Sequence, residues 1–262
     1  MSFYRKVVLV TGSSSGIGAV IAIHFSQLGA NVVVTGRNIC RIRRVAQQCR
    51  YVATRCAEVI EVVADLTKDC ECRRLIRRTI EEFGQLDVLI NNANVSGMSK
   101  VDDPKSAYIF DHIMHVNVRS TFLLSQLSIP HLELTNGCIV NISSRAASNP
   151  VTDYSLYCMS KASLDMMTKC LALDLKHKGI RVNAVNPSFL RPKVSRSVCC
   201  EEDKSEDDKL LHYPLKRLGE PQEIARTVEF LASGRATHIT GVTTAIDGDS
   251  LLSPFAIQSN KQ

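Results

Sequence analysis

Residues 6–18 read KVVLVTGSSSGIG, a short β-branched run that passes through a glycine-rich turn into a helical pattern. The run at 6–10 is typical of a buried strand, and apolar residues then recur with helical spacing over 17–29. Glycines in such a turn let the chain bend tightly and bring backbone amides, together with the helix N-terminus, close to a pyrophosphate. The stretch therefore predicts a dinucleotide-binding turn, and its candidate contacts are Gly12, Ser14, Ser15, Gly16 and Ile17.

The rest of the chain continues this alternation of strand-like and helix-like segments. We expect strands at 6–10, 31–36, in the segment that ends near Asp65, and at 86–93, 139–142, 179–187 and 239–247. We expect helices at 17–29, 38–50, 69–83, 104–129, after Pro150, and at 220–233. The alternation predicts an α/β fold: a doubly wound, Rossmann-type parallel sheet with helices on both faces, in a single domain over residues 1–262.

Composition fits a soluble globular protein. Of the 262 residues, 45% are hydrophobic and 22% charged, and no apolar run reaches the roughly 18 residues that a membrane span needs. The N-terminus has no signal-peptide pattern, and the ten cysteines are scattered through a chain too large to need disulfides. We therefore expect a cytoplasmic protein with reduced thiols, no membrane partner and, because no cysteine pair has a second pair at zinc spacing, no metal site.

A net charge of +6 raises the question of nucleic-acid binding. Two arginine clusters, at 41–44 and 73–78, fall on predicted helices where basic residues alternate with Glu, Cys, Ile and Leu. No aromatic residues are interleaved with them to stack on bases. We interpret the clusters as solvated helix faces and expect no nucleic-acid partner.

The end of the second predicted strand distinguishes between the nicotinamide dinucleotides. An acidic residue there would bind the ribose 2′-hydroxyl of NAD and repel a 2′-phosphate, but this chain has Thr35-Gly36-Arg37. A guanidinium can bind the 2′-phosphate with a forked pair of charge-assisted hydrogen bonds. Arg37 therefore favours NADP over NAD, with an ordinary surface cation at the start of a helix as the alternative.

Four polar side chains stand at positions suited to chemistry: Asn117, Ser144, Tyr157 and Lys161. Tyr157 and Lys161 share one face of a predicted helix because they are four residues apart. Ser144 lies just past the C-terminal end of a predicted strand, the edge at which doubly wound sheets bind ligands. Alone, the Tyr–Lys pair would be an ordinary helix pair, whereas the four together predict a catalytic cleft.

In their order and spacing, these motifs resemble the classical short-chain dehydrogenase/reductase family over nearly the whole chain. The motifs are T11-G12-x3-G16-I17-G18, N91-N92-A93, Asn117, Ser144, Y157-x3-K161 and VNAVNP at 182–187. The resemblance implies an NADP(H)-dependent oxidoreductase that interconverts an alcohol and a carbonyl by hydride transfer. It also implies a small-molecule substrate and a homo-oligomer, specifically a homotetramer.

The resemblance also assigns residue roles. Tyr157 would be the acid/base, Lys161 would lower its pKa, Ser144 would hydrogen-bond the substrate oxygen, and Asn117 would hold a water that relays to Lys161. The implied cofactor contacts are Asp65 and Leu66 at the adenine, Asn92 and Ala93 at the adenosine ribose, Pro187 and Leu190 on the nicotinamide side, and the pair Tyr157 and Lys161, with Lys161 at the nicotinamide ribose.

A charged, irregular excursion over about 188–216 is expected to form the substrate lid. Its apolar members would be Phe189, Leu210, Leu211 and Tyr213. The substrate itself is left open by the sequence.

The chain departs from the family pattern where glycines are usual. Asn94, Ala147, Ser188 and Asp249 replace them, and Pro192 replaces a threonine that commonly contacts the nicotinamide. Ala147 and Ser188 would strain the backbone if those sites require positive φ. The departures keep a second hypothesis open, a catalytically silent relative that binds a nucleotide or a protein partner.

Overall fold

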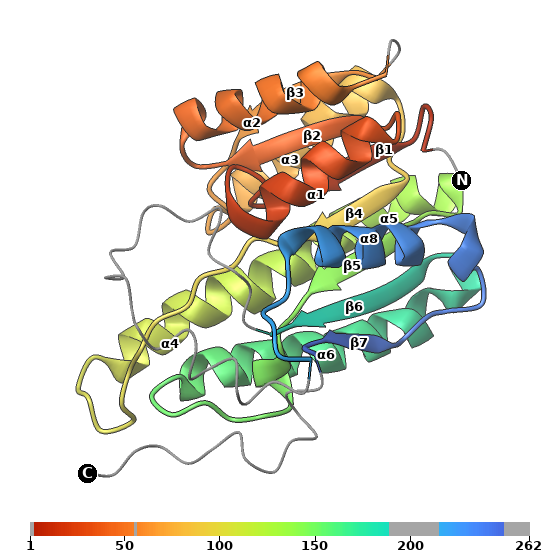
Figure 1. Cartoon of the computed structure of the whole chain (residues 1–262). Coiled ribbons are helices and arrows are strands. Elements are labelled where there is room, and N and C mark those ends of the chain that lie inside the picture. Colours follow the sequence, from red (N-terminus) through yellow and green to blue (C-terminus); the bar gives the residue numbers. More distant parts are fainter. Residues whose placement is uncertain (1–2, 55–56, 189–214, 249–262) are drawn as a thin grey trace.

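The structure is a computed structural model, and it describes residues 3–54, 57–188 and 215–248 (Figure 1). These residues form a seven-stranded sheet in the order β3-β2-β1-β4-β5-β6-β7, and every neighbouring pair of strands is parallel. The chain winds outward in one direction from β1 to β3, then crosses back to β4 and winds in the other direction. The predicted doubly wound α/β fold is confirmed, and its switch point lies between β1 and β4.

The strands are β1 (Val7–Val10), β2 (Asn31–Gly36), β3 (Val59–Val63), β4 (Val88–Asn91), β5 (Cys138–Ile142), β6 (Arg181–Pro187) and β7 (Thr243–Ile246). The α-helices are α1 (Gly16–Gln27), α2 (Ile39–Val52), α3 (Asp69–Phe83), α4 (Ser106–Met114), α5 (Ser120–Thr135), α6 (Ser155–Leu175) and α8 (Pro221–Ala232). A π-helical turn η1 (His115–Arg119) joins α4 to α5, and the 3₁₀ turns are η2 (Arg145–Ala147), η3 (Lys176–Lys178) and η4 (Gly234–Ala236).

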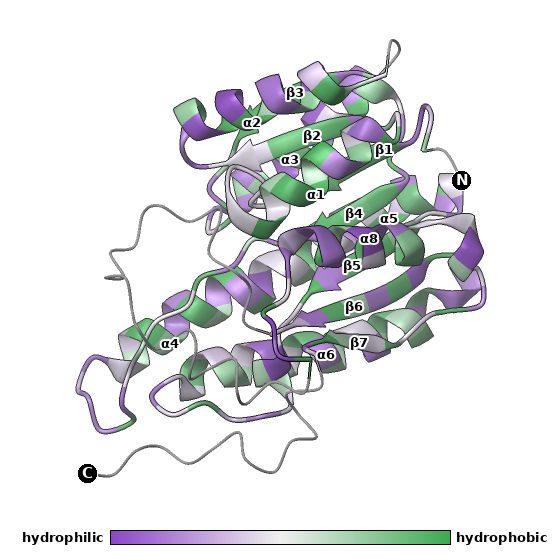
Figure 2. Ribbon diagram, viewed as in Figure 1, coloured by the Kyte–Doolittle hydropathy of each residue, from purple (hydrophilic) through white to green (hydrophobic). Residues whose placement is uncertain are grey.

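Helices cover both faces of the sheet and enclose two hydrophobic cores. In β1, Val8 and Val10 point into the core beneath α1, α2 and α8, while Val7 and Leu9 point into the core beneath α3, α5 and α6. This alternation follows from the two-residue period of a strand. Figure 2 shows the consequence: the central strands are hydrophobic, whereas the helices carry their polar residues mainly outward.

The predicted helix over 104–129 is interrupted in the structure and extends further. It begins as α4, passes through η1, and continues as α5 to Thr135. At the junction the backbone amide of Ser120 donates to the carbonyl of His115, five residues earlier, which is the bond of a π-helix. A hydrophobic pattern does not reveal one extra residue in a helix, so this turn could not be predicted from the sequence.

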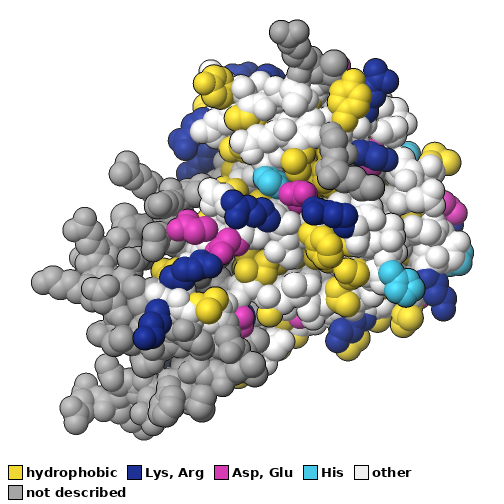
Figure 3. Space-filling view, turned by 45° about the vertical axis from the view of Figure 1, so that its right-hand side comes forward, with side chains coloured by type: hydrophobic (Ala, Val, Ile, Leu, Met, Phe, Trp, Pro, Cys, Tyr) yellow, Lys and Arg dark blue, Asp and Glu magenta, His cyan; other side chains and the backbone are white. Residues whose placement is uncertain are grey.

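The arginine clusters lie on exposed helix faces. On α3, Arg74 pairs with Glu71, and Arg77 and Arg78 both pair with Glu81. On the surface seen in Figure 3, the described basic side chains are interspersed with acidic and apolar ones. Such exposed pairs contribute little to stability.

Several expectations fall outside the described residues. These are the expectations for Asp249 and for the lid segment after Ser188. The lid residues concerned are Phe189, Leu190, Pro192, Leu210, Leu211 and Tyr213. Within the described ranges, the seven cysteines are free thiols. No helix in that part of the chain is both long and apolar enough to cross a membrane.

Candidate functional site

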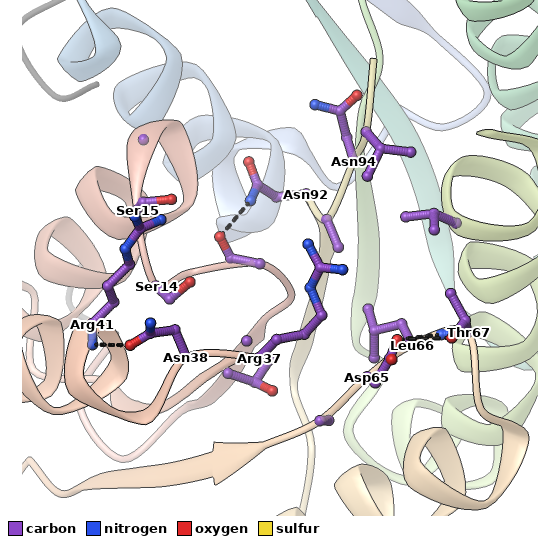
Figure 4. A pocket seen from close by; sticks show the side chains of 18 of the residues that line it. Ser14, Ser15, Arg37, Asn38, Arg41, Asp65, Leu66, Thr67, Asn92 and Asn94 are labelled. Carbon is purple, nitrogen blue, oxygen red and sulfur yellow. Dashed lines mark hydrogen bonds between the residues drawn. The ribbon is translucent and has the colours of Figure 1, made fainter. Parts of the chain in front are cut away.

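A cavity of about 360 Å³ lies at the C-terminal edge of the sheet, beside the switch point between β1 and β4 (Figure 4). Segments that follow β1, β2, β3 and β4 form its walls. The lining residues are Gly12, Ser14, Ser15, Gly16, Ile17, Thr35, Gly36, Arg37, Asn38, Arg41, Ala64, Asp65, Leu66, Thr67, Asn92, Ala93, Asn94, Val95 and Val116. This position is the one at which open α/β sheets bind dinucleotides.

The glycine turn needs glycine for two separate reasons. Gly12 and Gly16 have φ of +62° and +59°, a left-handed conformation that other residues rarely adopt. A Cβ on Gly12 would lie 2.8 Å from the Ala93 Cα, and one on Gly18 would lie 2.3 Å from the Asn92 Nδ2. The turn is therefore both bent and closely packed against the end of β4.

The first turn of α1 is open to an anion. The side chain of its N-cap residue, Ser15, makes no capping hydrogen bond, so it does not occupy the free backbone amides at the start of the helix. An uncapped helix N-terminus that faces a cavity is suited to a phosphate. The residues present thus fit the pyrophosphate of a dinucleotide.

Hydrogen bonds fix the end of β4 against the glycine turn. The Thr11 hydroxyl accepts from the backbone amides of Asn92 and Ala93, both at 2.9 Å, and Asn92 Nδ2 donates to the Thr11 carbonyl at 2.8 Å. These bonds place Asn92 and Ala93 on the cavity wall, where the sequence predicted a contact with the cofactor.

The far end of the cavity carries charges of both signs. In Figure 4 the Arg37 side chain reaches into the cavity, with Asp65 and Leu66 on the neighbouring strand end. Partial burial raises the pKa of Asp65, but hydrogen bonds from Thr67 and the charge of Arg37 outweigh it and lower that pKa below its usual value. Asp65 is therefore an anion, and its hydrogen bonds keep it with Thr67.

Sequence reasoning missed a second arginine, Arg41, in the first turn of α2. It lines the same cavity as Arg37. Neither has an ion-pair partner in the described part of the chain, whereas Arg43 and Arg50 of the same helix pair with Glu61. The spacing of four residues between Arg37 and Arg41 is a signal for this second contact, but the alternation of basic and apolar residues at 41–44 is equally typical of a solvated helix face. Asn38, Thr67 and Val95 were missed as well.

The structure also brings the four candidate catalytic side chains together. The Ser144 hydroxyl, after β5, lies close enough to Tyr157 of α6 to affect the pKa of the phenol. Lys161 Nζ lies 5.6 Å from the centre of the Tyr157 ring, and Asn117 Nδ2 donates to Ser160 of the same helix at 3.0 Å. Pro187, by contrast, ends β6 as a buried residue and does not line the cavity.

Asn117 joins this cluster to the cavity. Its Oδ1 accepts from the Val95 backbone amide at 2.8 Å and its Nδ2 donates to the Val95 carbonyl at 2.9 Å, and Val95 lines the cavity. Both hydrogens of the side-chain amide are thus donated to protein partners, and its oxygen accepts one of the two hydrogen bonds it can take. A water held by this residue would contact that oxygen or the main-chain carbonyl, which already accepts from the Thr121 hydroxyl.

The pKa of Tyr157 is the reverse of the sequence-based expectation. Burial raises it above its usual value, and the hydrogen bond with Ser144 acts in the opposite direction without outweighing burial. The Lys161 ammonium donates to the carbonyl of Ile142, at 2.9 Å, rather than to the phenol oxygen of Tyr157. In this arrangement Tyr157 is a protonated phenol at neutral pH.

Lys161 is almost completely buried, with 2% of its surface exposed. Burial lowers its pKa from 10.5 to about 8, and the carboxylate of Asp165 acts in the other direction without outweighing burial. A buried amine of this kind is destabilising at neutral pH, because the unfolded chain hydrates the same charge fully.

Replacing Lys161 with Met is therefore expected to change the pH dependence of stability. Between pH 8 and 10.5 the unfolded chain binds more protons at this site than the folded chain, so the wild type gains stability as pH rises. The stability of Lys161→Met relative to the wild type should fall by about 3 kcal/mol between pH 7 and pH 10.5. Urea denaturation at both pH values measures the difference, with the exposed Lys169→Met as control. Parallel pH dependences in all three proteins would contradict the burial argument.

The missing family glycines cause no backbone strain. Within the described residues, the non-glycine positions with positive φ are Arg5, Asn136, Asp153 and Lys216. Asn94, Ala147 and Ser188 are not among them, so these sites do not require glycine and the expected strain is absent.

Comparison with known proteins identifies the class. A family model described as enoyl-(acyl carrier protein) reductase matches residues 12–248. The chain belongs to the classical short-chain dehydrogenase/reductase family, whose members are oxidoreductases that act on CH–OH groups with NAD(P) as cofactor. The comparisons thus support the enzyme over the catalytically silent alternative.

Individual relatives cover nearly the whole chain. An uncharacterised oxidoreductase of Thermotoga maritima is 35% identical over 95% of this chain and 99% of its own length. L-xylulose reductase of Caenorhabditis elegans is 34% identical over 94% and 96%, and 7α-hydroxysteroid dehydrogenase of Escherichia coli is 34% identical over 93% of each chain. Among solved structures, a short-chain dehydrogenase/reductase from Serratia marcescens has a TM-score of 0.86 at 31% identity, covering 95% of this chain and 98% of its own.

Proposed function

We propose that the protein is an NADP(H)-dependent oxidoreductase that interconverts an alcohol and a carbonyl, with Tyr157 as the acid/base. The observation that carries the proposal is the cluster of Ser144, Tyr157 and Lys161, joined through Asn117 and Val95 to the glycine-turn cavity. When bound, the nicotinamide supplies or accepts the hydride.

The protein's own residues move the proton and hold the charge. In reduction, the Tyr157 phenol gives its proton to the carbonyl oxygen, while the Ser144 hydroxyl donates a hydrogen bond to the same oxygen as negative charge develops on it. The Lys161 ammonium, 5.6 Å from the Tyr157 ring centre, stabilises the phenolate that is left. The raised pKa of Tyr157 favours this acid role at neutral pH, and oxidation should accelerate as the phenol ionises at higher pH.

The cofactor preference rests on charge at the far end of the cavity. Arg37, without an ion-pair partner in the described residues, would bind the 2′-phosphate of NADP, and Arg41 adds a second positive charge on the same wall. NAD is the alternative. Gly12, Ser14, Ser15, Gly16 and Ile17 would hold the pyrophosphate. Asp65, Leu66, Asn92 and Ala93 would contact the adenosine half, while Pro187 and Leu190 would lie on the nicotinamide side, with Tyr157 and Lys161 also among the contacts.

The direct test is turnover with a panel of carbonyls and alcohols, measured by the absorbance of NADPH and of NADH in parallel. Relatives named L-xylulose reductase, L-fucose dehydrogenase, glucose 1-dehydrogenase and 7α-hydroxysteroid dehydrogenase make sugars and hydroxysteroids the first compounds to try. Turnover with NADPH that exceeds turnover with NADH supports the proposal. A complete lack of turnover would contradict it.

We further propose a homotetramer. A groove lined by Asp111, Met114, His115, Val118, Arg119, Phe122 and Met167 lies on the exposed side of α4, η1, α5 and α6. Phe122 and Met166, on the outer faces of α5 and α6, are 48% and 58% exposed. Apolar side chains clustered on a helical surface are typical of an interface. Multi-angle light scattering should give about four times the chain mass of 28.9 kDa, and a monomer at all concentrations would reject the assembly.

A cytoplasmic location is part of the same proposal. It is supported by the free thiols of the described cysteines, since disulfides form in oxidising compartments. Fractionation of cells that express the tagged protein tests it.

A further inference from the structure

Asp165 of α6 is a half-buried acid, and one of its carboxylate oxygens is buried without a hydrogen-bond partner among the described residues. Asn186 Nδ2 donates to Asp165 Oδ2 at 2.7 Å. Asp165 Oδ1 and Asn186 Oδ1 are both shielded from solvent, and neither has a hydrogen-bond partner in the described part of the chain. Burying a carboxylate oxygen without a donor costs free energy, so the fold alone gives no reason for an acid here.

The position of Asp165 relative to Lys161 supplies a reason. The two residues are four apart on α6 and so share a face of the helix. Lys161 Nζ donates to the carbonyl of Ile142 on β5, and Asp165 accepts from Asn186 on β6. Ile142 pairs with Val185, the residue before Asn186. The ammonium and the carboxylate are thus anchored at neighbouring positions of adjacent strands, which lie about 4.8 Å apart.

The other groups around Lys161 leave Asp165 as its counter-charge. Tyr157 precedes Lys161 on α6. The side chains from η1, β5 and β6 that hydrogen-bond to α6 include the neutral amides of Asn117, Asn141 and Asn186, which contact Ser160, Thr168 and Asp165 respectively. The other elements packed against α6 carry titratable side chains: Tyr108, Asp111 and His112 on α4, His115 and Arg119 on η1, Arg145 on η2, Lys176, His177 and Lys178 on η3, and Arg181 on β6. Among the described residues, Asp165 alone acts on Lys161 through its charge.

We propose that Asp165, held in place by Asn186, is a positioning residue that keeps Lys161 in its ammonium form beneath Tyr157. Its effect on Lys161 is a property of the unliganded chain. Its effect on catalysis rests on the proposed function, because only the ammonium can stabilise the Tyr157 phenolate.

The pKa of Lys161 lies only slightly above neutral pH. With Asp165 present, burial already lowers the pKa of Lys161 to about 8. Loss of a nearby opposite charge lowers the pKa of an ammonium by about one unit or more. In Asp165→Asn the amine would therefore be partly neutral at pH 7, and the proton that stabilises the phenolate would be missing from a share of the molecules.

The test is a titration of Lys161 by NMR in the unliganded protein. Protein labelled with ¹³C-lysine gives a signal from each Cε, and the Lys161 signal is assigned by its absence in Lys161→Met. The midpoint should fall by about one unit in Asp165→Asn and return toward the wild-type value in Asp165→Glu. Asp174→Asn, an exposed acid on the same helix, is the matched control and should leave the midpoint unchanged.

An unchanged midpoint in Asp165→Asn would overturn the proposal. If Asp165→Asn does not fold, Asp165→Ser provides a second neutral variant on which the same midpoint decides. In active protein, the fall of kcat/KM for carbonyl reduction at high pH should also begin about one unit lower in Asp165→Asn, which loss of stability alone would not produce. Because the titration needs no substrate, a failure of the proposed function is distinguishable from a failure of this inference.

Discussion

Replacing Tyr157 with Phe should lower kcat by about 10³-fold in both directions, because general acid–base catalysis of this kind contributes roughly 10²–10⁴-fold. The variant removes one hydroxyl from a mostly buried ring and leaves the packing of α6 intact. Binding of NADPH, measured by fluorescence titration, and the thermal midpoint should therefore change little. Stopped-flow and steady-state rates with the best substrate of the panel measure the loss.

The matched control is Tyr154→Phe, which deletes the hydroxyl of the N-cap residue of the same helix, three positions before Tyr157. It should retain nearly full activity. If Tyr157→Phe turned over as fast as the wild type, the acid/base assignment would be wrong even with the fold and the cofactor site intact.

Replacing Arg37 with Asp should weaken NADPH binding by about 100-fold or more. The change removes charge-assisted hydrogen bonds to the 2′-phosphate, worth about 1.5–3 kcal/mol each, and places a like charge beside it. Binding of NADH should change little, since its ribose carries a neutral hydroxyl there. Isothermal titration with both cofactors measures the two affinities and gives their ratio directly.

Arg44→Asp makes the same change of charge on an exposed position of α2, outside the residues that line the cavity. This control separates the effect of losing the contact between Arg37 and the 2′-phosphate from the effect of lowering the positive charge of the whole protein, which salt would screen. Equal losses for NADPH and NADH in Arg37→Asp would mean that Arg37 does not bind the 2′-phosphate, and NAD would become the better assignment.

Much of the fold can be predicted from the sequence because a parallel sheet is buried on both faces, and this burial leaves a recognisable hydrophobic pattern. Strands buried on both faces, such as VVLV in β1, read as continuous apolar runs, and segments with helical patterns alternate with them along the chain. The π turn at His115–Arg119 could not be predicted, because it depends on a backbone bond between Ser120 and His115. The register of each strand pair depends in the same way on tertiary packing.

The candidate site could be predicted where a residue's role depends on local spacing. The glycine turn and the Tyr157–Lys161 pair are of this kind. Arg41 and Asp165 were not predicted, because their relevance depends on which wall or strand they meet after folding. The pKa of Tyr157 could not be predicted either. It depends on how deeply the ring is buried and on the position of the Lys161 ammonium, which donates to the Ile142 carbonyl.

The π turn between α4 and α5 also sets the rotational phase of a long helix. One extra residue turns everything after it by about 100° relative to everything before it. Beyond the turn, Leu124, Ser128 and Leu132 form a buried stripe at four-residue intervals on α5. Within the turn itself, the side-chain amide of Asn117 hydrogen-bonds to Val95 and Ser160. Removing a single residue here would rotate either that stripe out of the core or that amide away from its partners. The length of this segment is therefore fixed simultaneously by packing at one end and by the candidate active site at the other.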